Sequence, residues 1–390
     1  MPTLFQINVT ANWGSTGRIS ESIGLAAINK GWKSYIAYGR YHNKSQSNLI
    51  KIGNNLDTYI HYAINRLCDK EGRGSINSTR KLIKQISIIK PDIIHLHNIH
   101  DHYLNYPIFF DYLNNYHTNI VWTFHDCWAF TGHCYHFVGV NCNKWKVECD
   151  KCPLKNNIYD RSNENFLLKK QYFTKNNIKI ITVSNWLKNL VEQSFFKDHD
   201  IITIHNGIDL KVFKPFQNVK KVNGVCKVIA VSNIWPPYKG LNDIIKIRDL
   251  LPENFEITIV GLSKKQIRTL PKGIKGINRT QNINELVKLY NESDVLINPT
   301  YADSFPTVNL EALACGIPVI TYNTCGSPEA IDEKTGFIIQ QGDILEMAEA
   351  IKNIANNPIN PNDCRKRSEQ YFDKDKCFDS YIKLYESMLK

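Results

Sequence analysis

Short apolar runs alternate with longer amphipathic segments along the whole chain, the pattern of an α/β protein built on parallel sheets. Each run is rich in Ile, Val, Leu, Phe or Tyr and is followed by a polar loop. A first set of strands is predicted at 4–9, 35–38, 91–97, 120–124, 178–183 and 201–204. A second set is predicted at 227–231, 255–260, 295–297, 319–322 and 335–339.

The segments between the strands carry apolar residues at helical spacing. Helices are predicted at 19–29, 59–68, 79–90, 163–175, 241–251, 283–291, 307–315 and 344–355. The tail shows the same spacing in Phe378, Tyr381, Leu384, Tyr385 and Met388. Two alternating sets in 390 residues predict two Rossmann-like, doubly wound domains at 1–210 and 227–370, joined by a linker at 211–226 and followed by a helix at 371–390.

Composition supports two full cores, since 43% of the residues are hydrophobic. No run of 18 apolar residues is present, and the N-terminus lacks a basic region followed by an apolar stretch. We therefore expect a cytoplasmic protein whose 11 cysteines are mostly reduced.

The net charge of +11 is concentrated in the first half of the chain. Residues 1–205 hold 24 Lys and Arg against 15 Asp and Glu, whereas the rest holds 24 against 22. Nucleic acid, anionic lipid and a phosphate-bearing acceptor are the partners that such an excess favours. No Lys/Arg-rich block is present, so nucleic acid is not expected; a solvated lysine-rich surface is the plain alternative.

The stretch 294–330 is the most informative part of the chain. Ser304 is predicted to cap the helix at 307–315, with Pro306 in its first turn and Gly316 ending it. A helix N-terminus that follows the end of a strand suits a phosphate. Asp303 precedes this helix and Glu311 lies among apolar residues on it. Sugar hydroxyls would supply the hydrogen bonds that such carboxylates need, although both could instead be exposed surface acids.

The pattern D-S-F-P-x4-E-A-x-A-x-G-x-P-V resembles the signature of the retaining glycosyltransferases of family 4, which have the GT-B fold: two Rossmann-like domains facing across a cleft. The resemblance implies that Asp303 contacts the donor sugar and Glu311 binds the nucleotide ribose. Asp303 stands where the family has Glu, so its side chain is one methylene shorter. Further donor-binding residues implied here are Ser304, Phe305, Thr307 and Val308.

Four more motifs of that family follow in the expected order. His125-Asp126 ends a strand, and the resemblance implies that His125 contacts the donor sugar; a histidine merely satisfied at a strand end is the alternative. Lys239-Gly240 is kept, which implies that Lys239 binds the donor diphosphate and stabilises it as it departs. Ser232-Asn233 replaces the family's Gly-Arg pair, so one cation of the family's donor site is missing. The resemblance implies that Asn233 contacts the donor at this position. Arg18 and Lys265 are the candidates to substitute for that cation.

The remaining two motifs are an early glycine loop and the sequence His205-Asn206-Gly207-Ile208-Asp209, which is expected to mark the crossing between domains. Glycines in a turn between strand and helix let backbone N–H groups approach a phosphate. The resemblance implies that this loop lies at the interdomain cleft and binds the donor, with Arg18 facing a donor or an acceptor phosphate. It also implies that the helix at 371–390 returns to the N-terminal domain. The loop residues are Gly14, Ser15, Thr16, Gly17 and Arg18.

A cysteine-rich insert follows His125-Asp126 at 127–153. Its cysteines at 134, 142, 149 and 152 end in a C-x2-C pair, the spacing with which two thiolates grip one zinc ion. A structural zinc at Cys134, Cys142, Cys149 and Cys152 is one interpretation; free thiols or a redox pair are the others. The segment resembles the branch of the family found in exopolysaccharide clusters, and there Trp128, Phe130, Tyr135 and His136 are candidates to face a sugar.

The resemblance thus implies a retaining glycosyltransferase that needs no metal for catalysis. A nucleotide-diphosphate sugar is the expected donor, and a saccharide, in particular a polyprenyl-diphosphate-linked one, is the expected acceptor. The basic N-terminal domain is expected to make peripheral contact with an anionic membrane at its inner face. A nucleotide-sugar 2-epimerase of the same architecture and a non-catalytic sugar-binding protein are the alternatives.

Overall fold

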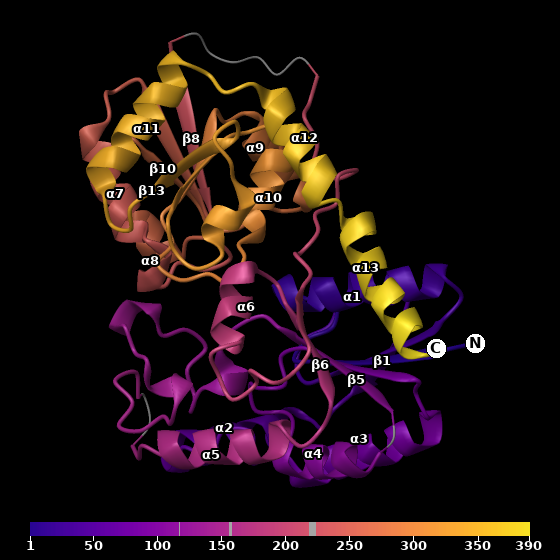
Figure 1. Ribbon diagram of the computed structural model, residues 1–390. Coiled ribbons are helices and arrows are strands. Elements are labelled where there is room, and N and C mark those ends of the chain that lie inside the picture. Colours follow the sequence, from indigo (N-terminus) through magenta and orange to yellow (C-terminus); the bar gives the residue numbers. More distant parts are fainter. Residues whose placement is uncertain (117, 156–157, 218–223) are drawn as a thin grey trace. The chain divides into compact units, whose positions relative to one another are not determined.

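In the computed structural model, which describes residues 1–116, 118–155, 158–217 and 224–390, the chain forms two compact units (Figure 1). The first consists of Met1–His205 with Phe378–Lys390, and the second of Asn206–Cys377. The first unit therefore ends at residue 205 rather than 210. Part of the predicted linker, 218–223, lies outside the described residues.

The first unit is built on a seven-stranded parallel sheet in the order β3-β2-β1-β4-β5-β6-β7. The order reverses between β1 and β4, which makes the sheet doubly wound. Its strands are β1 (Thr3–Asn8), β2 (Lys33–Tyr38), β3 (Asn48–Lys51), β4 (Ile93–Leu96), β5 (Asn119–Phe124), β6 (Ile178–Thr182) and β7 (Ile201–Thr203).

Helices cover both faces of this sheet (Figure 1). One face carries α3, α4 and α5, and the other carries α1 and the end of α13 (Lys374–Met388). From Phe378 on, α13 packs Tyr381, Ile382 and Tyr385 into the core over Leu4 and Ile93. The helices are α1 (Gly14–Asn29), α2 (Asn55–Cys68), α3 (Ile76–Ile89), α4 (Tyr106–Asn115), α5 (Ser162–Phe173) and α6 (Asn185–Val191).

The second unit has a six-stranded parallel sheet in the order β10-β9-β8-β11-β12-β13, with its reversal between β8 and β11. Its strands are β8 (Cys226–Val231), β9 (Phe255–Val260), β10 (Ile274–Ile277), β11 (Val295–Asn298), β12 (Val319–Tyr322) and β13 (Gly336–Ile339). Its helices are α7 (Leu241–Leu250), α8 (Lys264–Arg268), α9 (Ile283–Asn291), α10 (Thr307–Ala314), α11 (Ile344–Asn356) and α12 (Pro361–Tyr371).

Three local predictions need correction. The glycine segment is not a loop, because α1 already begins at Gly14. Strand β3 was not predicted, since it is a short, half-exposed edge strand with little apolar pattern. Ser304 does not cap α10: the N-cap is Pro306, and no side chain caps this helix.

Candidate active site

In the second unit, Lys239 and Asp303 come together at the carboxyl ends of the two central strands. Lys239 ends the short 3-10 helix η4 (Pro237–Lys239) after β8, and Asp303 follows β11. Lys239 Nζ lies 2.5 Å from Asp303 Oδ2. Gly240, with φ of +77°, permits this approach, because a Cβ there would lie 2.1 Å from the Pro299 carbonyl oxygen. The Lys-Gly motif thus places a cation at the reversal point of the sheet.

The loop between Asp303 and α10 leaves polar groups available to a ligand. Asp303 Oδ1 accepts a hydrogen bond from the Phe305 backbone N–H at 3.2 Å. The hydroxyl of Ser304 is buried and has no hydrogen-bond partner among the described residues. Since α10 also lacks a side-chain cap, its first turn, with Thr307 and Val308, offers N–H groups to an anion.

Glu311, on the second turn of α10, is half-buried and held by a buried tyrosine. The hydroxyl of Tyr290, on α9, donates to Glu311 Oε2 at 2.8 Å. Burial is the main cause that raises the pKa of Tyr290 well above its usual value, with Glu311 adding to it. The tyrosine therefore stays a neutral donor to the carboxylate. Apolar spacing places Tyr290 in the core, but its bond to Glu311 had no sequence signal.

The buried side chain of Asn309, on α10, links this helix to two other segments of the second unit. Its Oδ1 accepts from Asn298 Nδ2 at 2.9 Å, and its Nδ2 donates to the Ser327 carbonyl. These buried bonds fix α10 against the end of β11. Asn233, by contrast, is exposed in the loop after β8.

In the first unit, His125 begins a hydrogen-bonded chain that reaches α1. His125 Nε2 lies 3.2 Å from His97 Nδ1, and His97 Nε2 lies 3.0 Å from Gln6 Oε1. Gln6 Nε2 donates to the Ser20 carbonyl at 2.8 Å. A carbonyl oxygen only accepts, so Gln6 Oε1 must accept from His97, and His97 must accept from His125. The neutral His125 therefore carries its proton on Nε2, which leaves Nδ1 as an acceptor.

The pKa values agree with neutral rings in this chain. Burial lowers the pKa of His97 well below its usual value and that of His125 to about 4. For His125 burial outweighs the Asp126 carboxylate, which acts to raise the pKa, and the protonated His100 adds to the lowering. Sequence reasoning placed His97 at a strand end but missed its contact with His125.

His100 behaves in the opposite way. Its Nε2 lies 3.0 Å from Asp126 Oδ2, and although burial favours the neutral ring, Asp126 and Asp101 outweigh it and raise the pKa of His100 to about 10. Asp126 Oδ1 also accepts from the Trp128 backbone N–H at 2.9 Å. The aspartate of the His-Asp motif therefore anchors the start of the insert.

The first turn of α1 lies at the carboxyl end of β1. Gly17 is buried, and a Cβ there would lie 2.6 Å from Thr10 Oγ1, so the helix and strand end pack too closely for a side chain. Thr16 Oγ1 accepts from Asn8 Nδ2 at 3.3 Å, whereas Gly14, Ser15 and Arg18 are exposed. No side chain caps α1 at Trp13.

In the insert, Trp128 and Phe130 are 1% and 0% exposed, so they form core rather than a surface that faces a sugar. Trp128 Nε1 and the Tyr135 hydroxyl both donate to the buried Glu71, each at 2.8 Å. Tyr135 itself is 37% exposed.

Comparison with known proteins matches both units to glycosyltransferase families. Residues 25–212 match the model "Glycosyltransferase Family 4", and residues 214–371 match "Glycosyl transferases group 1". The Escherichia coli protein WcaC, described as a colanic acid biosynthesis glycosyl transferase, is 23% identical over 371 residues and covers 90% of each chain. CapM of Staphylococcus aureus, described as a capsular polysaccharide biosynthesis glycosyltransferase, is 25% identical over 54% of this chain and 62% of its own.

Solved structures share the fold at low identity. Sucrose-phosphate synthase of Thermosynechococcus elongatus superposes with a TM-score of 0.76 at 15% identity, covering 100% of this chain and 99% of its own. Anabaena HepE, solved in complex with UDP-glucose, superposes with a TM-score of 0.68 at 12% identity over 99% of both chains. The predicted GT-B fold class is confirmed.

Proposed function

This chain is a glycosyltransferase, with a family 4 N-terminal domain and a group 1 C-terminal domain, and we propose that it transfers a sugar from a nucleotide-diphosphate donor with retention of anomeric configuration. We further propose that the acceptor is a saccharide on a polyprenyl diphosphate, in the synthesis of a bacterial surface polysaccharide. Relatives described as colanic acid and capsule enzymes support that setting.

The observation that carries the proposal is the grouping of Lys239, Asp303 and α10 at the reversal point of the second sheet. A nucleotide-sugar donor leaves as a diphosphate, and its charge grows as the sugar bond breaks. An ammonium group and an uncapped helix N-terminus stabilise that charge most when it is fully developed. Lys239 Nζ lies 2.5 Å from Asp303 Oδ2, and the lysine side chain is 21% exposed. A diphosphate can therefore compete with the Asp303 carboxylate for the ammonium group. We therefore expect turnover without added Mg²⁺ or Mn²⁺.

The two remaining polar groups fit the rest of the donor. Glu311, oriented by Tyr290, is proposed to accept from the ribose hydroxyls. His125, neutral and with Nδ1 as an acceptor, is proposed to accept from a hydroxyl of the transferred sugar. The exposed loop residue Asn233 and the first turn of α1 are proposed as further donor contacts.

Contact with a membrane is proposed through α2 of the first unit. Its exposed residues Leu56, Tyr59, Ile60 and Leu67 recur at helical spacing and are each 51–71% exposed, so an apolar stripe faces solvent. The neighbouring α3 exposes Arg80, Lys81 and Lys84. Apolar and aromatic side chains beside basic ones match an interfacial site on anionic lipid.

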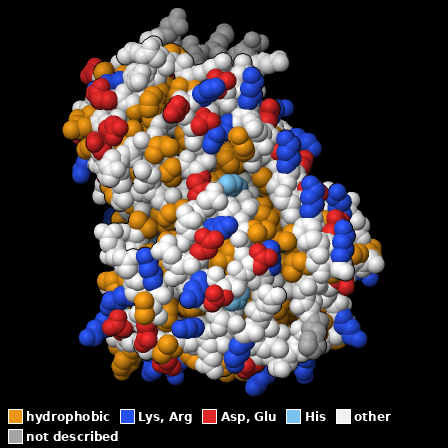
Figure 2. Space-filling view, in the orientation of Figure 1, with side chains coloured by type: hydrophobic (Ala, Val, Ile, Leu, Met, Phe, Trp, Pro, Cys, Tyr) orange, Lys and Arg blue, Asp and Glu red, His pale blue; other side chains and the backbone are white. Residues whose placement is uncertain are grey.

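Two further findings bear on this contact. On the face drawn in Figure 2, Lys and Arg stand among Asp and Glu rather than in one basic block, which does not favour nucleic acid. Among the residues that the structure describes, no helix has the length and hydrophobicity needed to span a bilayer.

The test is nucleotide release from a panel of UDP-, GDP- and ADP-sugars, with and without a lipid-linked acceptor extract. We expect release from one donor, increased by acceptor, with a product that keeps the anomeric configuration. Conversion of a UDP-sugar to its 2-epimer without acceptor would contradict transfer and assign the epimerase reaction instead. Donor binding without any turnover in the presence of acceptor would support a binding protein.

A further inference from the structure

The insert of the first unit encloses a small cavity lined by cysteine side chains. The cavity has a volume of about 20 Å³, enough for one ion or water molecule. Cysteines from three separate turns of the insert line it, together with one histidine: Cys134, Cys142, Cys149, Cys152 and His133.

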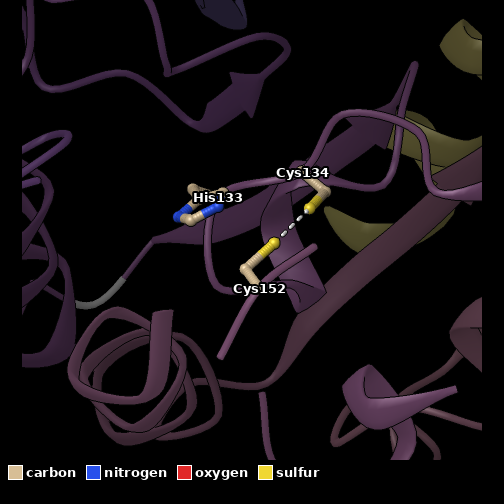
Figure 3. Close-up of side chains that lie close together, drawn as sticks. All are labelled: His133, Cys134 and Cys152. Carbon is tan, nitrogen blue, oxygen red and sulfur yellow. Dashed lines mark hydrogen bonds between the residues drawn. The ribbon is translucent and has the colours of Figure 1, made fainter. Parts of the chain in front are cut away.

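Two of these sulfur atoms already stand at the separation that a tetrahedral metal imposes. Cys134 Sγ lies 3.5 Å from Cys152 Sγ, and the two point toward each other (Figure 3). Zinc–thiolate bonds of about 2.3 Å at tetrahedral angles give a sulfur–sulfur distance of about 3.8 Å. A disulfide would need about 2.05 Å, and both cysteines are free thiols here. The two thiols therefore share a hydrogen bond, at a spacing close to that of two ligands of one ion and too long for a covalent bond.

Backbone hydrogen bonds hold the cysteines in place, as the outer groups of metal sites do. The Gly132 N–H donates to Cys149 Sγ at 3.4 Å, and the Cys152 N–H donates to Asp160 Oδ2 at 2.8 Å. Thr131 Oγ1 donates to the Cys134 carbonyl at 2.7 Å. At the far turn, Trp145 Nε1 donates to the Cys142 carbonyl at 2.9 Å, and the Trp145 ring is buried against Phe130 and Phe137.

A buried cation beside the cavity supplies an independent reason for negative charge in it. Lys169, on α5, is 1% exposed, and its Nζ donates to the carbonyls of Trp128 and Thr131 at 2.8 and 3.1 Å. Its Nζ also lies 3.6 Å from the centroid of the Trp128 ring, so carbonyls and an aromatic face, rather than a carboxylate ion pair, are its partners among the described residues. A buried ammonium group without a counter-ion is costly. Four thiolates around one Zn²⁺ carry a net charge of −2, which would offset it.

The insert also has little regular structure to hold it together. Between Cys127 and Arg161, the described residues form only three-residue 3-10 helices: η1 (Trp128–Phe130), η2 (Val138–Val140) and η3 (Lys144–Lys146). Long segments of this kind inside a compact unit are uncommon, and a metal is one device that closes them.

We propose that this cavity is a structural zinc site with the thiolates of Cys134, Cys142, Cys149 and Cys152 as its ligands. Zinc is favoured because soft thiolates in a tetrahedral set select it. His133 lies with both its nitrogens near acids and thiols: Nδ1 is 3.5 Å from Asp69 Oδ2, and one ring nitrogen is within 4.8 Å of the sulfurs of Cys134 and Cys152. Because four thiolates already complete a tetrahedral set, we assign His133, whose ring lies beside Asp69, as an outer hydrogen-bonding group rather than a ligand.

The first test is the metal content of the full chain, purified without chelator. We expect about one zinc per chain, and after replacement by Co²⁺ the intense visible absorption of a tetrahedral thiolate site. Under native conditions, removal of the zinc should make four of the 11 thiols newly reactive toward a thiol reagent. A zinc content far below one equivalent, together with the absence of such a Co²⁺ spectrum, would overturn the proposal. A mass that is two hydrogen atoms lower for each pair of these cysteines would also overturn it, because that mass identifies disulfides.

Variants then test the ligand set, with zinc content as the readout. Cys152→Ser and Cys142→Ser should each lose the zinc, whereas Cys68→Ser, a half-buried thiol of the same unit outside the cavity, should keep it. His133→Gln should also keep it. Loss of zinc in His133→Gln with retention in Cys142→Ser would overturn the four-thiolate assignment. Because the wild-type measurements need no variant and no turnover, they decide the proposal even where a variant fails to fold, and independently of the proposed reaction.

Discussion

The two units differ in how deeply they bury some of their polar side chains. The first buries them: His97 and Lys169 are each 1% exposed and sit in hydrogen-bonded networks that end on backbone carbonyls. The second keeps its candidate charges at the surface of a strand end, with Lys239 and Asp303 21% and 23% exposed.

This difference in burial suits the side chains to two different functions. A buried network fixes which atom of a histidine carries the proton, because each partner can only donate or only accept. A partly exposed ion pair is weakly held and can be exchanged for a charged ligand. We infer that the His125–His97 network of the first unit orients a neutral ring, whereas the exposed ion pair of the second unit is suited to receive a diphosphate.

The largest expected effect is at the exposed pair. Lys239→Ala should lower kcat by roughly 100- to 1,000-fold, the loss typical of one group that stabilises charge in a transition state. Steady-state nucleotide release measures it. Lys246→Ala, an exposed lysine on α7, is the matched control and should keep full activity. Full activity in Lys239→Ala would remove the lysine from the reaction.

The second effect is the loss of stability in acid that buried histidines cause, and these histidines all belong to the first unit. All 12 histidines lie in residues 1–205. His61 accepts from the Gly74 N–H through Nε2, and burial, with help from His102, lowers its pKa to about 3. The unfolded chain therefore binds a proton that the folded one excludes, so stability is lost as pH falls from about 6.5 toward 3.

The free energy of unfolding should therefore fall with decreasing pH. His61→Gln should reduce the slope of this dependence by the contribution of up to one proton, or about 1.4 kcal/mol per pH unit. Unfolding followed by tryptophan fluorescence measures it, because six of the seven tryptophans lie in the first unit and only Trp235 lies in the second. A variant with the same pH slope as wild type would contradict the neutral, buried state of His61.

A smaller effect is expected at the tyrosine that orients Glu311. Tyr290→Phe removes one hydrogen bond and should lower the free energy of unfolding by about 1 kcal/mol. If Glu311 binds the donor, KM for the donor should also rise several-fold with little change in kcat. Tyr322→Phe is the control: it loses a similar bond to Asp243 and should lose stability while KM stays unchanged. Equal KM values in both variants would make Tyr290 purely structural.

The smallest effect on the protein itself is expected on α2. The double change Tyr59→Ser and Ile60→Ser alters exposed side chains, so stability should shift by no more than about 0.5 kcal/mol. Co-sedimentation with vesicles that contain an anionic lipid should fall markedly. Ile338→Ser and Leu345→Ser, two exposed apolar residues of the second unit, form the control. Vesicle binding that survives the α2 change would move the contact elsewhere, and a change of oligomeric state would indicate a second chain instead.

Much of the fold could be predicted because apolar strands with Gly or Asp at their ends are local signals. Contiguous motifs likewise indicate Lys239, Asp303 and Glu311, and the roles of these residues at the donor stay a prediction. The bonds between distant residues could not be predicted: His125 meets His97, and Tyr290 meets Glu311, only through the order of strands and helices. The N-cap prediction for Ser304 was wrong, because the N-cap of α10 lies two residues later, at Pro306.

We propose that the second unit binds the nucleotide while His125 contacts the transferred sugar. Calorimetric titration of the free nucleotide product into wild type, Glu311→Ala and His125→Ala tests it most directly. The account predicts that Glu311→Ala weakens nucleotide binding by roughly 10- to 100-fold, as for a lost bond to a charged group, and that His125→Ala leaves it unchanged. Wild-type affinity in Glu311→Ala, or equal weakening in both variants, would contradict it.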